Sequence, residues 1–335
     1  MPRIVLLYQY YEPDDVVSAQ HFAGLARGLA GRGWEVEAVP CNRSCRDDGR
    51  RFLRKERIDG VEVRRIWRPR FSQGSGLKRI LSSFWMILAW IGGAIAGRFR
   101  ATDIVIVGTD PVLAVVVIPF LKLLVPRLKA VHLVYDLYPE AAVADGLILE
   151  HSMINRLLRR LLGWSYERCD LMIDIGPCMR ERLSLYGGTS QRRTIEPWAL
   201  VEPKEVQPPN REERDSLFGS AKLGLLYSGN LGRAHDYSRF VALSRAMRGE
   251  SVAICFAVRD SERSPIQAMA ESEPGNLRVV DLVPQSALQA HLSAADVHLA
   301  SLRPGWAGTV IPSKFFGSLA VGRPVLFSGD TTSSI

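Results

Sequence analysis

Short runs of aliphatic and β-branched residues alternate with helix-forming segments along almost all of this 335-residue chain. Such runs are typical of parallel strands covered on both faces, and their alternation with helices indicates doubly wound parallel sheets. The expected strands are residues 3–8, 34–39, 103–108, 130–135, 170–175, 194–198, 223–227, 252–258, 277–283, 296–302 and 325–327. The helices expected between them include 21–30, 112–125, 153–168 and 177–186. The length and this alternation predict an α/β protein of two domains, residues 1–198 and 199–335.

Residues 308–325 contain the signals of a helix start, one apolar helix face and a helix stop. Pro312 followed by Ser313 predicts the start, with Ser313 as the N-cap, and Gly322 predicts the stop. The residues expected on the buried face are Phe315, Phe316, Leu319 and Ala320. Lys314 in the first turn opposes the helix macrodipole, and an anion bound at that helix end would reverse this penalty. The alternative interpretation is a solvated surface lysine.

A glycine-containing loop follows the strand expected at 223–227. Its Gly229 and Gly232 allow backbone N–H groups to approach an anion, and Arg233 adds a forked hydrogen-bond donor. Together with Lys314 on a second helix start, this loop predicts a clamp for a diphosphate group. A plain strand-to-helix turn is the alternative.

Two carboxylates, Asp136 and Glu140, follow the apolar strand expected at 130–135. Ligand sites in open α/β sheets lie beyond the carboxyl ends of the strands, and acidic groups placed there are candidates for catalysis. We therefore predict that both side chains line a catalytic cleft. In the alternative interpretation Asp136 caps a helix and Glu140 is a solvated surface residue.

The net charge of +8 is concentrated in residues 43–79, which hold 13 Lys and Arg residues against five Asp and Glu residues. Residues 80–97 then contain no charged side chain, in a run close to the minimum length for a membrane span. A nucleic-acid partner explains the charge but not the apolar run, and a buried core helix explains the run but not the charge. We therefore favour a helix over 78–100 that lies in the plane of an anionic membrane surface.

In this interpretation Lys78 and Arg79 belong to a basic collar, and Trp85 and Trp90 are interfacial anchors. A buried core helix and a membrane span remain as alternatives, and no nucleic-acid partner is expected. The five cysteines form no C-x-x-C pair, which is typical of reduced cytosolic thiols.

The pattern Pro-Ser-Lys, two aromatic residues and Leu-Ala-Val-Gly-Arg-Pro-Val at 312–325 resembles the nucleotide-sugar-binding helix of glycosyltransferase family 4. The Asp-Leu-Tyr-Pro-Glu segment at 136–140 is similar to a signature of its bacterial surface-polysaccharide branch. The resemblance implies a GT-B fold with two Rossmann-like domains and sugar transfer with retention of configuration. The donor-binding residues expected on this basis are Gly229, Asn230, Gly232, Arg233, Thr309, Ser313 and Lys314.

The chain departs from the family pattern at two points. Many members carry glutamates at the positions that here hold Thr309 and Gly317, so the usual carboxylate contacts to the donor are missing. Family members also continue with further helices where this sequence ends at Ile335, and we expect a C-terminally truncated protein.

The resemblance implies a glycosyltransferase of the hexosyl- or N-acetylhexosaminyltransferase type. Its donor would be a nucleoside-diphosphate sugar, and its acceptor would be lipid-linked, at the cytoplasmic face of the cell membrane. No metal or other cofactor is expected, because no His, Asp or Cys cluster has ligand spacing and cations can neutralise the leaving diphosphate. The alternative from another functional class is a non-catalytic, membrane-associated binding protein that is inactive through truncation.

Overall fold

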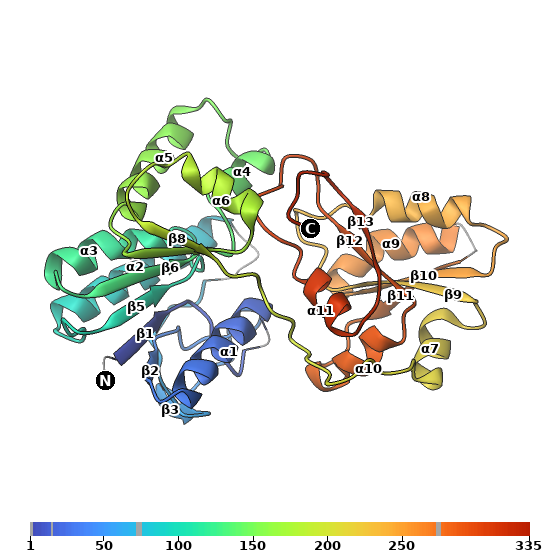
Figure 1. The fold of residues 1–335 in the computed structure, drawn as a ribbon, viewed down its shortest axis with the longest axis horizontal. Coiled ribbons are helices and arrows are strands. Elements are labelled where there is room, and N and C mark those ends of the chain that lie inside the picture. Colours follow the sequence, from blue (N-terminus) through green and yellow to red (C-terminus); the bar gives the residue numbers. More distant parts are fainter. Residues whose placement is uncertain (1–2, 15, 72–75, 273–275) are drawn as a thin grey trace. The chain divides into compact units, whose positions relative to one another are not determined.

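The computed structural model describes residues 3–14, 16–71, 76–272 and 276–335, and the chain divides into two compact units, Met1–Glu196 and Pro197–Ile335 (Figure 1). We call them the N-terminal unit and the C-terminal unit. The division lies two residues before the domain boundary expected from the sequence. Each unit is built on its own sheet.

The sheet of the N-terminal unit has the strand order β3-β4-β2-β1-β5-β6-β7-β8, and its neighbours are parallel except for the antiparallel pair β3 and β4. The strands are β1 Arg3–Leu7, β2 Glu35–Ala38, β3 Lys55–Ile58, β4 Val61–Arg64, β5 Ile104–Val107, β6 Lys129–Leu133, β7 Leu171–Asp174 and β8 Gln191–Thr194. The helices are α1 Val17–Gly31, α2 Gly76–Ile95, the 3-10 turn η1 Ala114–Val116, α3 Val117–Leu124, α4 Glu140–Ala144, α5 Met153–Tyr166 and α6 Pro177–Ser184. The central strands are apolar because helices cover both faces of the sheet.

The sheet of the C-terminal unit has the order β11-β10-β9-β12-β13 and is parallel throughout the described residues. Its strands are β9 Leu223–Ser228, β10 Val252–Val258, β11 Leu277–Asp281, β12 Val297–Ser301 and β13 Val325–Ser328. Its helices are α7 Arg211–Phe218, α8 Ser238–Ala246, α9 Asp260–Ser272, the 3-10 turn η2 Gln285–Ala287, α10 Leu288–Ser293 and α11 Lys314–Ala320. Buried residues from both sides of β9 and β10 form the two cores of this unit.

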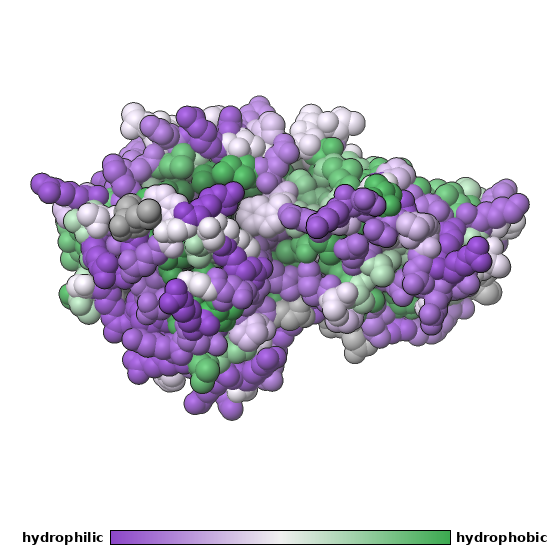
Figure 2. Space-filling view, turned by 60° about the horizontal axis from the view of Figure 1, so that its bottom comes forward, coloured by the Kyte–Doolittle hydropathy of each residue, from purple (hydrophilic) through white to green (hydrophobic). Residues whose placement is uncertain are grey.

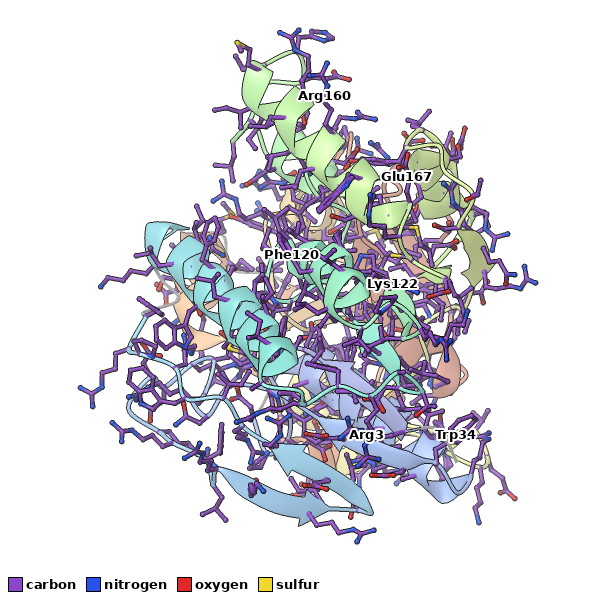
Figure 3. The ribbon with its side chains drawn as sticks, turned by 90° about the vertical axis from the view of Figure 1, so that its left-hand side faces the viewer. Arg3, Trp34, Phe120, Lys122, Arg160 and Glu167 are labelled. Carbon is purple, nitrogen blue, oxygen red and sulfur yellow. The ribbon has the colours of Figure 1, made fainter. Side chains whose placement is uncertain are left out.

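Three helices cover one face of the N-terminal sheet together. The chain leaves β1 toward β2 in one direction and leaves β5 toward β6 in the other, so right-handed connections put α1 and α3 on opposite faces. Helix α3 packs between α2 and α5, and Figure 3 shows the three helices side by side toward the viewer. We call this layer the α2–α3–α5 face.

Helix α2 confirms the helix expected over 78–100, although it ends at Ile95. Its inner side is buried on the core of the unit through Met86, Trp90 and Ala94. The Trp90 side chain is 1% exposed, and its Nε1 donates a hydrogen bond of 3.0 Å to the Val39 carbonyl oxygen. Trp90 is therefore a core residue, and its prediction as an interfacial anchor is wrong.

The outer side of α2 remains uncovered within its own unit. Phe84 and Leu88 are exposed, Leu88 at 62%, and Lys78 and Arg79 are exposed at the first turn. Trp85 is more than a third exposed, and its Nε1 donates to the Trp67 carbonyl oxygen at 2.8 Å. Among the described residues, no helix has both the length and the apolar character that crossing a membrane requires.

Part of the basic segment 43–79 has a structural role. The side chains of Arg65 and Arg68 are fully buried and paired with Glu56 and Asp48, the second pair at 2.8 Å between Nη2 and Oδ1. Paired and buried in this way, they cannot face a membrane. The expectation that the whole segment forms a basic collar is therefore too broad.

Other differences from the expected elements have local causes. The segment expected as one helix at 112–125 consists of η1 followed directly by α3, and it begins only at Ala114 because Leu113 takes a left-handed conformation with φ of 66°. The strand expected at 194–198 is instead β8, a half-exposed strand of polar residues at the edge of the sheet. The hairpin of β3 and β4 was not expected, although Asp59 and Gly60 carry the positive φ values of a tight hairpin turn.

Candidate functional site

The C-terminal sheet reverses its strand order at β9. The chain runs from β9 to β10 and β11 on one side, and later to β12 and β13 on the other. Ligands of open α/β sheets bind at such a switch point, beyond the carboxyl ends of the strands. The loop after β9 contains Gly229 and Arg233, and the loop after β12 leads to Lys314 at the start of α11. The two loops predicted to bind the donor therefore follow adjacent strands at this switch point.

Lys314 is held by two aromatic residues of the β9 region. Its Nζ lies 3.2 Å from Nε2 of His235 and 4.7 Å from the centre of the Tyr227 ring. On the other side of the imidazole, Nδ1 lies 2.7 Å from the carbonyl oxygen of Ser301 at the end of β12. Because a carbonyl oxygen only accepts hydrogen bonds, Nδ1 carries the ring proton and Nε2 accepts from Lys314.

His235 therefore acts as a neutral support for the lysine. Burial and then the charge of Lys314 lower the pKa of His235 to about 3. The positive charge of the pair accordingly stays on Lys314 at neutral pH. Sequence reasoning did not assign a role to His235, because its support of Lys314 depends on the neighbouring strand β12.

Gly229 brings the backbone of the β9 loop close to this ammonium group. Its φ of +134° is a conformation that L side chains rarely adopt, and a Cβ there would lie 3.4 Å from Cε of Lys314. Its N–H donates to the Ala257 carbonyl oxygen at 3.0 Å, so it is not the anion donor expected from the sequence. The Tyr227 hydroxyl donates to the Asn230 carbonyl oxygen at 3.2 Å and fixes the next residue of the loop.

Two further arginines border the same loop and were missed by sequence reasoning. Nε of Arg303 donates to the His235 carbonyl oxygen at 3.0 Å, and Nε of Arg259 donates to the side-chain oxygen of Asn230. Arg259 is the first residue after β10 and Arg303 is the second after β12, which is the signal that the alternating pattern offered. Gly232 and Arg233 are exposed in the loop. We call Arg233, Arg259, Arg303 and Lys314 the cation cluster; guanidinium and ammonium groups are the usual partners of phosphate.

The start of α11 differs from its prediction. Ser313 occupies the N-cap position, but its side chain makes no capping hydrogen bond. Thr309 is fully buried, and its hydroxyl donates to the Trp306 carbonyl oxygen at 2.8 Å, so it shapes the loop. Leu319, which was expected on the buried face of α11, is 52% exposed, and the residue buried there instead is Ser318. Helix α11 is only seven residues long. We therefore expect the cation cluster to attract an anion more strongly than the dipole of this helix does.

The N-terminal sheet has its own switch point, between β1 and β5. Asp110 follows β5, and its carbonyl oxygen accepts a 2.8 Å hydrogen bond from the Gln9 N–H of the loop after β1. Asp136 follows the next strand, β6. Burial and then the charge of Asp136 raise the pKa of Asp110 to about 7, and burial raises the pKa of Asp136 to about 6. Two carboxyl groups with raised pKa values therefore follow the neighbouring strands β5 and β6 at this end of the sheet.

Glu140 does not share that environment. Its two carboxylate oxygens accept hydrogen bonds of 2.8 and 3.0 Å from the Tyr186 hydroxyl, and Nη1 of Arg159 lies 3.7 Å away. The Arg159 guanidinium also lies over the Tyr186 ring at 5.2 Å. Glu140 thus ties α4 to α5 and to the residues after α6. Asp136 and Glu140, predicted together, therefore lie in different surroundings, and the catalytic role of Glu140 stays a prediction.

The residue before Thr109 and Asp110 must be small. A Cβ at Gly108 would lie 2.4 Å from both Cζ of Phe22 and Cδ2 of Tyr8, whose rings stack 4.0 Å apart. The close approach of these rings therefore positions the Asp110 segment. Among the described residues, no group of three or more His, Cys, Asp or Glu side chains is placed to hold a metal ion.

Comparison with known proteins identifies the family of this chain. A family model described as a glycosyl transferase 4-like domain matches residues 18–198, more than half of the chain. The chain belongs to this family, as its motifs predicted.

Two curated relatives are similar to parts of the chain. It is 28% identical to a probable glycosyltransferase of Pseudomonas aeruginosa, WbjE, over 75% of this chain and 62% of the relative. It is 26% identical to WcaI of Escherichia coli, a putative colanic acid biosynthesis glycosyl transferase, over 33% of this chain and 28% of that protein. The chain thus matches less than two thirds of the length of either relative.

Solved structures are similar over nearly the full chain. Sucrose-phosphate synthase from Thermosynechococcus elongatus superimposes with a TM-score of 0.72 at 16% identity, covering 98% of this chain and 81% of that one. The Anabaena protein HepE, in complex with UDP and glucose, superimposes with a TM-score of 0.61 at 12% identity, covering 98% and 82%. The likeness confirms the predicted GT-B fold, with a parallel-sheet domain in each half.

Proposed function

We propose that this protein is a retaining glycosyltransferase that moves a hexosyl or N-acetylhexosaminyl group from a nucleoside-diphosphate sugar to a lipid-linked acceptor. The observation that carries the proposal is the cation cluster at the switch point of β9 and β12. Lys314 is held there on His235 and Tyr227, in the sheet position where α/β proteins bind ligands. Family membership supports the transfer chemistry.

In this proposal the cation cluster neutralises the charge that develops on the leaving diphosphate. Positive groups held in place before the reaction stabilise such charge without reorganisation, which is the largest single contribution in many enzymes. Lys314 meets this condition because its ammonium is fixed by a neutral imidazole and an aromatic ring. A solved relative of the same fold, HepE, is described in complex with UDP and glucose, which supports this type of ligand.

Asp110 and Asp136 are the proposed acidic groups of the reaction. With raised pKa values near neutrality, one of them can hold a proton while the other is ionised, so the pair can accept a proton from an acceptor hydroxyl. Their place at the N-terminal switch point, where open sheets bind ligands, supports this role. Retention of configuration rests on the resemblance to family 4.

We further propose a role in bacterial surface-polysaccharide synthesis at the cell membrane. The Escherichia coli relative is described as a putative colanic acid biosynthesis enzyme. The uncovered outer side of α2, with Lys78 and Arg79 at its start, favours a site of action at the inner face of the cell membrane.

The test is release of nucleoside diphosphate from UDP-, GDP- and dTDP-sugars by the purified chain, with and without bacterial lipid extract. We expect one donor class to be turned over, and turnover to increase with the extract. Absence of release from every donor, with folding intact, would refute the proposal.

A further inference from the structure

The α2–α3–α5 face exposes more apolar surface than α2 alone, and most of it was missed by sequence reasoning. Helix α3 exposes Phe120, Leu123 and Leu124, and Leu123 is 77% exposed. The exposed apolar residues of α5 and the loop before it are Leu147, Leu149, Met153, Ile154, Leu157 and Trp164. By contrast, the view in Figure 2 is mostly hydrophilic with small hydrophobic patches. Large contiguous apolar patches mark surfaces that bind a partner or a membrane.

One aromatic pair at the surface joins α3 to α5, and another joins α2 to the segment after β4. Phe120 of α3 and Trp164 of α5 are both 38% exposed and pack edge to face with ring centres 6.2 Å apart. Trp85 of α2 packs in the same way on Trp67, at 5.3 Å, and Trp67 is 55% exposed. Trp residues that keep a polar N–H and an apolar ring at the surface are typical of the membrane interface.

The charged side chains within the three helices have one sign, although Lys122 of α3 is paired with Asp170 in the segment before β7. The sequences of α2, α3 and α5 contain Lys and Arg residues but no Asp or Glu. Arg156 and Arg160 are exposed on α5, and the Arg168 guanidinium lies 4.6 Å from the centre of the Trp164 ring. The acidic residues nearest in sequence, Glu150 and Glu167, lie beyond the two ends of α5. Figure 3 shows Phe120, Lys122 and Arg160 on this layer.

We propose that the α2–α3–α5 face docks the protein on an anionic lipid bilayer, with Phe120, Leu123, Leu157 and Trp164 entering the interface and Arg156 and Arg160 facing lipid headgroups. A protein partner of ordinary composition does not require three adjacent helices without acidic residues, whereas an anionic bilayer favours them. Amphipathic helices with basic residues at their rim lie in the plane of an anionic bilayer, and the α2–α3–α5 face can adopt this orientation. The inference rests on the proposed lipid-linked acceptor and extends the membrane contact from α2 to α3 and α5.

The experiment is vesicle co-sedimentation of the full chain, with phosphatidylcholine alone and with added phosphatidylglycerol. Changing Arg156 and Arg160 to Gln should weaken binding to the anionic vesicles by about 10- to 30-fold, because each basic residue near the surface contributes about fivefold. The matched control changes Lys55 and Arg57 to Gln on β3, at the far edge of the sheet, and should leave binding unchanged.

A second pair of variants tests the apolar contact. Changing Phe120 and Leu123 to Ser should reduce binding to both kinds of vesicle, whereas Leu185→Ser, at a 70% exposed position after α6, should not. Circular dichroism checks that each variant is folded. Wild-type binding by both α3 and α5 variants would overturn the proposal, as would equal losses in the controls. A dimer in solution that these substitutions dissociate, with vesicle binding unchanged, would make the face a subunit interface instead.

The outcome can be separated from that of the proposed function. Nucleoside-diphosphate binding is measured on the same variants and should equal that of the wild type, because no substitution touches the C-terminal unit. If the docking proposal is wrong, vesicle binding is unaffected by the substitutions but the wild type still releases nucleotide from its donor. If the proposed function is wrong, the wild type releases no nucleotide but its vesicle binding still responds to the substitutions.

Discussion

Lys314→Met tests whether the cation cluster binds a diphosphate. Methionine keeps most of the alkyl chain that packs on Tyr227 and removes only the ammonium, so the fold should be retained. The ammonium is half-buried, 3.2 Å from His235 Nε2 and 4.7 Å from the Tyr227 ring centre. A cation fixed by two contacts loses little side-chain entropy when it binds an anion.

The expected loss follows from the charge and its surroundings. Two unit charges 4 Å apart attract each other by about 4 kcal/mol at an effective dielectric constant of about 20, before desolvation is subtracted. After desolvation, a hydrogen bond to a charged group contributes a net free energy of about 1.5–3 kcal/mol. We therefore expect Lys314→Met to weaken nucleoside-diphosphate binding by about 10- to 150-fold.

Isothermal titration calorimetry with UDP and GDP measures this loss. Lys222→Met is the matched control, because Lys222 is an exposed lysine of the same unit just before β9, and its removal should change affinity less than twofold. Added salt should weaken binding to the wild type more than binding to Lys314→Met. If Lys314→Met binds both nucleotides as tightly as the wild type, the cation cluster is not the donor site.

Other substitutions test the remaining roles. His235→Gln should weaken nucleotide binding by about 2- to 10-fold, with no change of this ratio between pH 5 and 8, because His235 is already neutral there; calorimetry at both pH values checks this. Asp110→Asn should abolish most turnover in the nucleotide-release assay and leave nucleotide binding unchanged. It should also stabilise the fold, because a carboxyl group with a raised pKa costs stability as pH rises from about 4 to 7; the gain in urea unfolding should be at most about 4 kcal/mol at pH 8 and smaller at pH 5. Glu140→Gln should cost about 1–2 kcal/mol of stability in the same unfolding assay, since it weakens a structural network. Trp90→Ser should cost about 3–5 kcal/mol of stability, whereas Trp85→Ser should cost much less.

The strands of the two sheets were predictable where they are apolar. β1, β5 and β10 are continuous aliphatic runs because helices cover both their faces, and the predicted bounds differ from the observed ones by one residue at most. β3 and β4 were missed and β8 was misplaced because much of their sequence is polar and faces solvent, so burial leaves no continuous apolar run. The Asp59–Gly60 turn was the available signal for the hairpin.

The site was predictable in its loops but not in its pairings. Gly229 and Lys314 were found because a glycine after a strand and a cation at a helix start are local signals. The support of Lys314 by His235, and the effect of Asp136 on the pKa of Asp110, depend on which strands are neighbours. Sequence spacing instead suggested Glu140, four residues after Asp136, which α4 turns toward Tyr186.

Acceptor-dependent nucleotide release tests the central claim most directly. The full chain is incubated with UDP-, GDP- and dTDP-sugars, lipid extract is added, and free nucleoside diphosphate is measured together with sugar in the lipid phase. We predict that one donor releases its nucleotide in proportion to the sugar found in lipid, and that Lys314→Met and Asp110→Asn both reduce this transfer. Nucleotide binding without release from any donor, in the presence of lipid, would contradict the claim and make the protein a nucleotide-sugar-binding protein without transferase activity.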